Sequence, residues 1–251
     1  HSDLRRQRQM CIRDRHNEDE ILRKDIRIGD TVKIQRAGDV IPQVISVETS
    51  KRKKESKKFI FPTKCLCGAP TSKEISKTTK KEDAVRRCTK GYECKFIARE
   101  KLKHIVSKES LNIEGLGKKV IDQFWDLNLI KKPSDIFNLD FEKIKKLEGW
   151  GDLSIKNLEK AIKKSQTIFL DKFIFSIGIR HIGQENAKIM ASFFTTIKEF
   201  SKLLESDPRK KVLKNLIDLD GIGETQISSI DNFFLNKTNI QTTKELIQKL
   251  K

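Results

Sequence analysis

Four cysteines are the residues of this sequence whose type and spacing point most directly to chemistry. They form two pairs, Cys65-x-Cys67 and Cys88-x5-Cys94, in a lysine-rich stretch that follows no secretory signal. Disulfides are disfavoured in such a setting, whereas four thiolates suit a closed, tetrahedral structural zinc site without an open position for catalysis. Buried free thiols are the alternative. The fifth cysteine, Cys11, stands alone and receives no role.

Glycines accompany both cysteine pairs. Gly68 follows Cys67 directly, and Gly91 lies inside the second pair. Glycine suits the tight turns that aim backbone amides at metal-bound sulfurs. Residues 60–100 are too few and too polar to build a core of their own, so zinc would stabilise them. The Cys-x-Cys spacing is one residue shorter than usual, and we expect it to strain the first turn.

Four glycine-rich segments recur in the second half of the chain. The last glycines of successive segments are 34, 32 and 40 residues apart, and helical patterns flank each segment. The segments are Ile113-Glu-Gly115-Leu-Gly117, Leu147-Glu-Gly149-Trp-Gly151, Ile177-Gly-Ile-Arg180-His-Ile182-Gly183 and Leu219-Asp-Gly221-Ile-Gly223. They predict sharp turns between pairs of short helices.

Turns of this kind can hold phosphates. The backbone amides at the start of the second helix point outward, and the helix dipole favours an anion there. Nearby cations would add charge to the contact, namely Lys118, Lys119, Lys156 and Arg180. Since nothing in the repeat reads a base edge, we expect sequence-independent binding to a nucleic-acid backbone. The alternative is that the glycines merely end helices. The third segment lacks the plain Gly-x-Gly form and is the weakest candidate.

The elements before the cysteines are short. Asn17 is expected to cap a helix, with Glu20 completing a capping box. Residues 26–48 predict a β-hairpin that turns at residues 37–39, and Pro42 indicates an edge strand or a bulge. Because one hairpin does not fold alone, we interpret it as the remainder of a small β-barrel.

Basic and helical stretches make up the rest of the chain. Residues 51–58 (KRKKESKK) are either a solvated loop or a patch that contacts phosphates. From about residue 101 the pattern is helical. Residues 1–15 carry five arginines and no lysine. We interpret them as a segment foreign to the following domain, arising from a truncation or a sequence junction; a targeting peptide and a basic nucleic-acid arm are the alternatives.

Composition favours several small modules over one large core. Of 251 residues, 36% are hydrophobic and 35% are charged, and 53 lysines and arginines against 35 acids give a net charge of +18. No run of eighteen apolar residues exists, which excludes a membrane-spanning helix. The charge predicts an anionic partner, with nucleic acid first and an acidic membrane surface second.

The order of these parts resembles NAD-dependent bacterial DNA ligase over about residues 16–251. The resemblance rests on HNEDEI (16–21), IRIGDTVKIQRAGDVIPQV (26–44), the cysteine segment and KLKHIVSKESLNIEGLG (101–117), followed by three more hairpins. It implies a multi-domain, mainly α fold with a partial OB-fold β-barrel, a small four-cysteine zinc module and a tandem helix-hairpin-helix domain. In that family these parts together encircle nicked duplex DNA.

The resemblance assigns roles by position. It implies zinc ligands at Cys65, Cys67, Cys88 and Cys94, and it places Arg36 on the OB surface that faces DNA. The hairpin glycines would grip the minor-groove backbone, namely Gly115, Gly117, Gly149, Gly151, Gly183, Gly221 and Gly223. The expected domains are an atypical segment (1–15), the partial OB-fold with its basic linker (16–58), the zinc module (59–100) and the helix-hairpin-helix domain (101–251).

The chemistry that the resemblance implies needs residues that this chain lacks. In the family the lysine of a K-x-D-G motif is adenylated from NAD with magnesium, AMP passes to the 5′-phosphate of the nick, and the 3′-hydroxyl attacks. Lys146-Leu-Glu148-Gly149 and Lys81-Glu-Asp83-Ala match that motif poorly. We therefore expect an adenylation domain before residue 1 and a BRCT domain near or beyond Lys251.

The expected function is binding without sealing. The chain should bind nicked double-stranded DNA as a monomer, without a membrane, in the bacterial cytoplasm with the nucleoid. Two departures from the family are the Cys-x-Cys spacing, where Cys-x-x-Cys is usual, and the absence of the upstream OB strands. Two alternatives stay open: a non-enzymatic OB and helix-hairpin-helix protein that binds DNA junctions, and a zinc-stabilised protein-interaction module.

Overall fold

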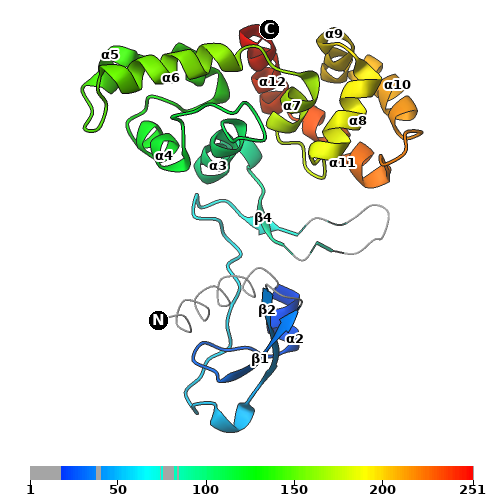
Figure 1. The fold of residues 1–251 in the computed structure, drawn as a ribbon. Helices are drawn as coiled ribbons and strands as arrows, with labels where there is room; N and C mark the ends of the chain where they lie inside the picture. Colours follow the sequence, from blue (N-terminus) through cyan, green and yellow to red (C-terminus); the bar gives the residue numbers. More distant parts are fainter. Residues whose placement is uncertain (1–17, 38–40, 74, 76–81, 84, 251) are drawn as a thin grey trace. The chain divides into compact units, whose positions relative to one another are not determined.

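The computed structural model describes residues 18–37, 41–73, 75, 82–83 and 85–250 (Figure 1), without the side chains of residues 36, 37, 41–43 and 92. The chain divides into two compact units, residues 1–89 and 90–251. Each unit is described by itself below. The described part is mainly helical, as the sequence predicts.

The first unit begins with the expected helix and hairpin. Helix α2 spans Glu18–Arg23, and strands β1 (Val32–Ala37) and β2 (Ile41–Val47) pair antiparallel, which confirms the hairpin predicted for residues 26–48. A register shift between Lys33 and Ile34 bends the pair. The described sheet has only these two strands, so both are edges. Of the turn predicted at residues 37–39, Ala37 belongs to β1, whereas residues 38 and 39 lie outside the described residues, as does the predicted cap Asn17.

Ion pairs rather than a large core fix the chain after the hairpin. The 3-10 helix η2 (Thr49–Lys51) leads to Arg52, whose guanidinium contacts Asp30 at 2.8 Å and Asp25 at 2.6 Å. The Asp30 side chain is 1% exposed, and the hydrogen bond from Arg52 lowers its pKa. A carboxylate this deeply buried is stable only with such a partner. One of the six basic residues at 51–58 therefore has a structural role.

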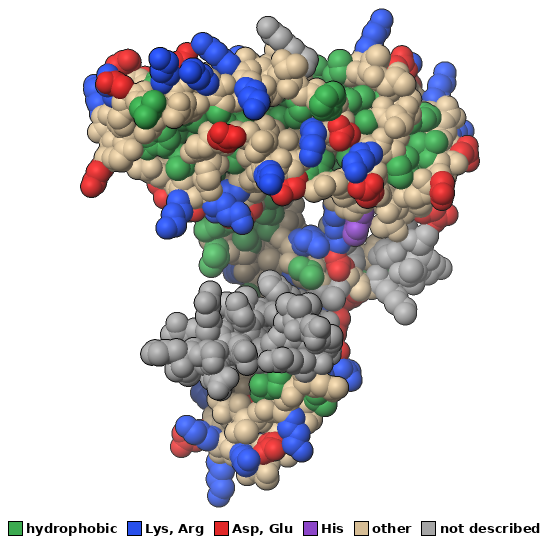
Figure 2. All heavy atoms as spheres, in the orientation of Figure 1, with side chains coloured by type: hydrophobic (Ala, Val, Ile, Leu, Met, Phe, Trp, Pro, Cys, Tyr) green, Lys and Arg blue, Asp and Glu red, His purple; other side chains and the backbone are tan. Residues whose placement is uncertain are grey.

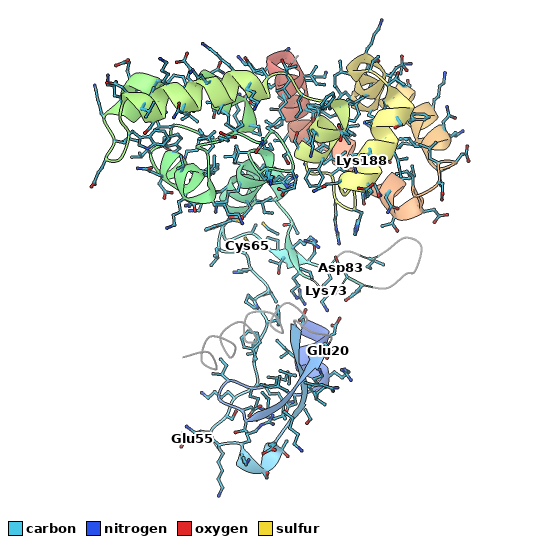
Figure 3. All side chains as sticks on the ribbon, viewed as in Figure 1. Glu20, Glu55, Cys65, Lys73, Asp83 and Lys188 are labelled. Atoms are coloured by element: carbon cyan, nitrogen blue, oxygen red, sulfur yellow. The ribbon has the colours of Figure 1, made fainter. Side chains whose placement is uncertain are left out.

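The cysteine segment of the first unit is tied to α2. Strands β3 (Thr71–Ser72) and β4 (Arg87–Cys88) pair antiparallel. Arg86 contacts Glu18 at 2.7 Å, and Lys73, which Figure 3 labels, contacts Asp19 at 2.6 Å. These pairs join residues that are more than fifty positions apart in the sequence. They hold the two-stranded β3–β4 sheet against helix α2.

The second unit is helical almost throughout (Figure 1). After the 3-10 helix η3 (Gly91–Glu93), its α-helices are α3 (Lys95–Ile105), α4 (Lys118–Asp126), α5 (Phe141–Lys145), α6 (Asp152–Ser165), α7 (Leu170–Ser176), α8 (Gln184–Phe194), α9 (Ile197–Ser201), α10 (Ser206–Leu216), α11 (Glu224–Leu235) and α12 (Lys237–Lys249). The 3-10 helices η4 (Pro133–Asn138) and η5 (Lys202–Leu204) complete it.

One hydrophobic core runs through this unit, from Leu102 to Leu246. Phe200 is fully buried at its centre, and its ring makes edge-to-face contacts with Phe173, Phe194 and Phe234 at centroid distances of 5.4 to 6.1 Å. The core holds the helices in place, and it contains none of the cysteines. Within the described residues, no helix is both long and apolar enough to span a membrane.

Glu245 joins the last helix to η4, and this contact predicts an acid-sensitive step in stability. The Ser134 hydroxyl donates to the carboxylate at 2.6 Å, and Lys132 and Gln241 add contacts at 2.9 and 3.1 Å. Together they lower the pKa of Glu245 to about 2. In the unfolded chain the ordinary value of 4.5 returns, so the stabilisation is complete above pH 4.5 and is lost as the pH falls toward 2.

We expect Glu245→Gln to reduce the stability of the helical unit at pH 7 by about 1 kcal/mol, since the partly exposed ion pair is screened by solvent. The same change should flatten the dependence of the melting temperature on pH between 5 and 2. Thermal unfolding followed by circular dichroism measures both. Exposed Glu142 provides the matched Glu→Gln control. A pH profile of Glu245→Gln identical to that of the parent would contradict this assignment.

Candidate metal centre and nucleic-acid interface

The first cysteine pair sits on a tight turn. The amide of Gly68 donates to the carbonyl of Cys65 at 2.8 Å, and the amide of Cys65 donates to Ala69 at 2.7 Å. Gly68 has a φ of +83°, which glycine adopts at little cost. The sequence-based expectation of a glycine turn here is confirmed. The Cys-x-Cys spacing is accommodated because the turn closes around residues 65–69.

The second pair is held by β4 and by the start of α3. Cys88 pairs with Thr71 in the β3–β4 sheet, and Cys94 is the fully buried N-cap of α3. Between them Gly91 has a φ of +53° and accepts a hydrogen bond from the Cys94 amide at 3.1 Å. Both pairs therefore end in turns that depend on a glycine with positive φ.

The four sulfur atoms lie within 4.8 Å of one another, and those of Cys67 and Cys88 are 3.5 Å apart. A tetrahedral zinc ion with Zn–S bonds of about 2.3 Å separates its sulfurs by about 3.8 Å. The cluster of Cys65, Cys67, Cys88 and Cys94 thus fits a metal ion of that size with small adjustments. His104 of α3 is not part of this cluster, and its Nε2 lies 2.9 Å from the carbonyl oxygen of Phe175.

All four glycine segments connect two helices in the same way. They join α3 to α4, α5 to α6, α7 to α8 and α10 to α11, and we name them hairpins 1 to 4. The last glycine of each hairpin is the N-cap of its second helix. These N-cap residues are Gly117, Gly151, Gly183 and Gly223. The second helices have nine to fourteen residues, so each carries a developed dipole.

Each hairpin also contains a four-residue turn whose third residue has positive φ. Gly115, Gly149 and Gly221 have φ of +90°, +85° and +88° at this position. In hairpin 3 the position is occupied by His181, with a φ of +59°. Histidine is one of the few residue types found in this region at modest frequency. The irregular third segment therefore has the same turn as the others, which sequence reasoning missed because a left-handed histidine leaves no pattern.

The hairpins pack in two pairs. The first glycine of hairpin 1 lies against Leu158 of α6, and that of hairpin 4 lies against Ile189 of α8. Hairpins 1 and 2 also share a groove of about 820 Å³, lined by both turns together with Lys160 and Lys164 of α6. The pairing thus follows chain order, 1 with 2 and 3 with 4.

Neither the backbone conformation nor the packing requires glycine at the N-caps of hairpins 1 to 3. Their φ values are −68°, −99° and −82°, which any residue adopts, and a Cβ built on Gly117, Gly151 or Gly183 meets no atom within 4 Å. Serine, threonine or aspartate would cap these helices at least as well. The missing side chains leave space in front of the helix amides.

Hairpin 4 differs from the other three. Its N-cap amide, that of Gly223, already donates to Oε1 of Gln226 at 3.2 Å. Glu224 occupies its first helical position, and its turn contains Asp220, where hairpins 1 and 2 have Glu114 and Glu148. In addition, a Cβ at Gly221 would meet Ile189 Cδ1 at 2.8 Å, so packing explains that glycine. The acids are visible in the sequence, whereas the Gln226 contact is not.

Cations are distributed unevenly over the hairpins. Lys118 and Lys119 are exposed in the first turn of α4, and neither has an ion-pair partner within the described residues. Lys156 is exposed one turn further along α6, where Asp152 is paired with Lys145 at 2.5 Å. Arg180 lies in the turn of hairpin 3, and burial lowers its pKa. The Arg36 side chain lies outside the description, although its backbone belongs to β1.

Comparison with known proteins agrees with this architecture. Residues 14–56 match the NAD-dependent DNA ligase OB-fold domain, and residues 172–243 match the helix-hairpin-helix motif. A DNA ligase of Pelagibacter ubique is 54% identical over 237 residues, which cover 94% of this chain and 34% of that protein. Nearly all of this chain is homologous to a segment of DNA ligases. The resemblance stated from the sequence is thereby confirmed.

Other relatives give the same picture. A DNA ligase of Parvibaculum lavamentivorans is 44% identical over 233 residues, covering 89% of this chain and 33% of the relative. One of Afipia carboxidovorans is 42% identical over 251 residues, covering 94% and 35%. The chain thus spans about a third of the length of the DNA ligases that it matches. The helix-hairpin-helix match covers hairpins 3 and 4, and the geometry above adds hairpins 1 and 2.

Proposed function

We propose that this chain is the DNA-holding portion of an NAD-dependent DNA ligase. It binds nicked duplex DNA through the phosphate backbone across the minor groove, and the 251 residues alone do not seal the nick. The observation that carries the proposal is the repeated N-cap glycine with open space before the helix amides. The similarity of nearly the whole chain to part of DNA ligases supports it.

Hairpins 1 and 3 are the strongest phosphate sites in this proposal. An anion at Gly117 or Gly183 would accept hydrogen bonds from helix N-terminal amides and lie beside a cation, Lys118 and Lys119 in one case and Arg180 in the other. Gly151 has the same open space, although the negative charge of Asp152 weakens the attraction of the α6 N-terminus for a phosphate. Gly221 and Gly223 are the weakest candidates, because acids and the Gln226 contact compete with a phosphate there.

The cysteine cluster would hold zinc in a structural role. Cys65, Cys67, Cys88 and Cys94 supply four thiolates, the ligand set of closed structural sites. Bound there, the ion would take the place of a hydrophobic core, since the part of 60–94 that the structure describes has almost no buried apolar side chain. The domain division at 16–58, 59–100 and 101–251 is part of this proposal.

For the whole protein, we propose nick joining during DNA replication and repair, in the bacterial cytoplasm with the nucleoid. NAD and magnesium would serve an adenylated lysine outside these residues. Neither Lys146 nor Lys81 is in a K-x-D-G motif, and Lys146 is the C-cap of α5, directly before the turn of hairpin 2. The chain would act as a monomer.

The salt dependence of binding tests the backbone contact. With about six phosphates neutralised, log K for nicked duplex should fall against log[salt] with a slope of roughly −5. Lys118→Gln with Lys119→Gln should reduce the slope by about 2, whereas the exposed pair Lys210 and Lys211 on α10, changed in the same way, should not alter it. Fluorescence anisotropy with labelled duplex gives these values. A slope near zero would refute electrostatic backbone binding.

The same assay separates the alternatives. A junction-binding protein would prefer a four-way junction over nicked duplex, and a protein-interaction module would bind neither nicked nor intact duplex. The proposal expects nicked and intact duplex to bind with similar salt slopes, because the hairpins contact backbone only.

A further inference from the structure

The basic run at residues 51–58 borders a groove in the first unit. The groove has a volume of about 500 Å³, and we name it the lysine groove. Its lining combines charged and apolar side chains, those of Ile28, Lys53, Ser56, Lys57, Lys58, Phe59 and Ile60 among them. The sequence left open whether this run is a solvated loop or a phosphate-contacting patch.

The backbone around the lysine groove is held in place. Arg27 pairs with Lys58 through an isolated antiparallel bridge, and its guanidinium donates to the carbonyl of Ser56 at 2.8 Å. The amide of Ser56 closes a turn onto Lys53 at 3.0 Å. The buried contact of Arg52 with Asp30 anchors the start of the run. A loop with these contacts presents its remaining side chains in a defined arrangement.

Four lysines of the run keep their charge available. Within the described residues, Lys53, Lys54, Lys57 and Lys58 form no ion pair with a carboxylate. Glu55, which Figure 3 labels, is the one acid among residues 51–58, and it lines the groove beside three of these lysines. Figure 2 shows lysine and arginine side chains, with acidic side chains among them, projecting from the first unit. The groove is therefore a positively charged surface.

Apolar side chains stand exposed beside these lysines. Ile28 is 81% exposed and Ile60 is 86% exposed, while Phe59 is half-buried with its ring in edge contact with Phe61 at 5.5 Å. A DNA duplex offers phosphates to such a surface but keeps the faces of its bases stacked inside. Single strands offer both phosphates and base faces. The combination of free lysines and exposed apolar groups thus favours an unpaired strand.

We propose that the lysine groove binds a short single-stranded segment of DNA, such as an unpaired end beside a nick. Lys53, Lys57 and Lys58 contact its phosphates, and Ile28, Phe59 and Ile60 contact its bases. The source of the strand rests on the proposed function, whereas the chemistry of the groove does not. This site is separate from the hairpin glycines, which hold duplex backbone.

Binding of a fluorescein-labelled twelve-residue oligothymidine to the full 251-residue chain tests the proposal. Lys57→Gln with Lys58→Gln should weaken binding of the single strand about tenfold, through two lost phosphate contacts, and should change binding of a blunt duplex less than twofold. Ile60→Ser should weaken binding of the single strand about threefold without altering its salt slope. Lys210→Gln with Lys211→Gln is the matched charge control and should alter neither.

The outcomes separate this proposal from the proposed function. If duplex binds normally and both groove variants bind the single strand like the parent, the groove proposal fails and the function stands. Equal losses for duplex and single strand would also overturn the groove proposal, because the lysines would then act through general charge. If a glutamate-rich peptide with a central phenylalanine binds in a Lys57- and Ile60-dependent manner while oligothymidine does not, the occupant is an acidic peptide and the proposal is wrong. Failure of the chain to bind any DNA would overturn both.

Discussion

Cys88→Ser should release the bound zinc and unfold the cysteine segment while leaving the helical unit folded. Cys88 belongs to the β3–β4 sheet, and its sulfur lies 3.5 Å from that of Cys67, so its loss removes a ligand and leaves three thiolates around the site. Structural zinc contributes about 10 kcal/mol or more of apparent binding free energy to small modules of this kind. Among the described residues between 60 and 94, only Ala69 and Cys94 are buried apolar residues, so little apolar packing could replace it.

Zinc content per chain, measured by mass spectrometry after gel filtration, should fall from about one to near zero. Trypsin should then cut within residues 60–94, while the helical circular dichroism of the second unit persists because its core begins at Leu102. Cys11→Ser provides the same substitution at the cysteine without an assigned role. Equal zinc content in both variants and the parent would show that these cysteines are free thiols.

Gly117→Ser should abolish most duplex binding contributed by hairpin 1 without destabilising the fold. Gly117 has an extended backbone and open space around its Cα, so serine fits, and its hydroxyl caps α4 better than glycine by a few tenths of a kcal/mol. That hydroxyl would occupy the amides to which a phosphate binds. Losing a charge-assisted contact costs about 1.5–3 kcal/mol, which is tenfold or more in affinity.

Gly183→Ser should act in the same way at hairpin 3. Gly223→Ser is the matched control at hairpin 4, where Gln226 already occupies the Gly223 amide and Glu224 disfavours an anion at the amides that follow, and we expect less than a twofold change. Anisotropy with nicked duplex reports the affinities, and thermal unfolding reports the stability. If Gly223→Ser weakened binding as much as Gly117→Ser, the assignment of unequal hairpins would be wrong. If none of the three mattered, phosphate binding at the N-caps would be excluded.

The contrast between hairpins 3 and 4 marks the limit of pattern reading. From its letters hairpin 4 is a better match than hairpin 3, since it has Gly221 and Gly223 in the Gly-x-Gly form. From the structure we propose the reverse order. His181 completes the turn of hairpin 3 with positive φ, whereas Gln226 occupies the amide of hairpin 4.

The sequence by itself determined the features that depend on local spacing. The glycine repeats, the hairpin at 26–48, the cysteine pairs with their turn glycines and the basic charge all follow from residues close together in the chain, because turns and helix starts depend on local backbone preferences. Tertiary structure alone decided which groups meet. It gathered four sulfurs within 4.8 Å, buried Arg52 against Asp30, left Lys53, Lys54, Lys57 and Lys58 without an ion pair among the described residues, and paired hairpin 1 with 2 and 3 with 4. Such contacts join residues far apart in the sequence, and their energies depend on burial, which no local pattern records.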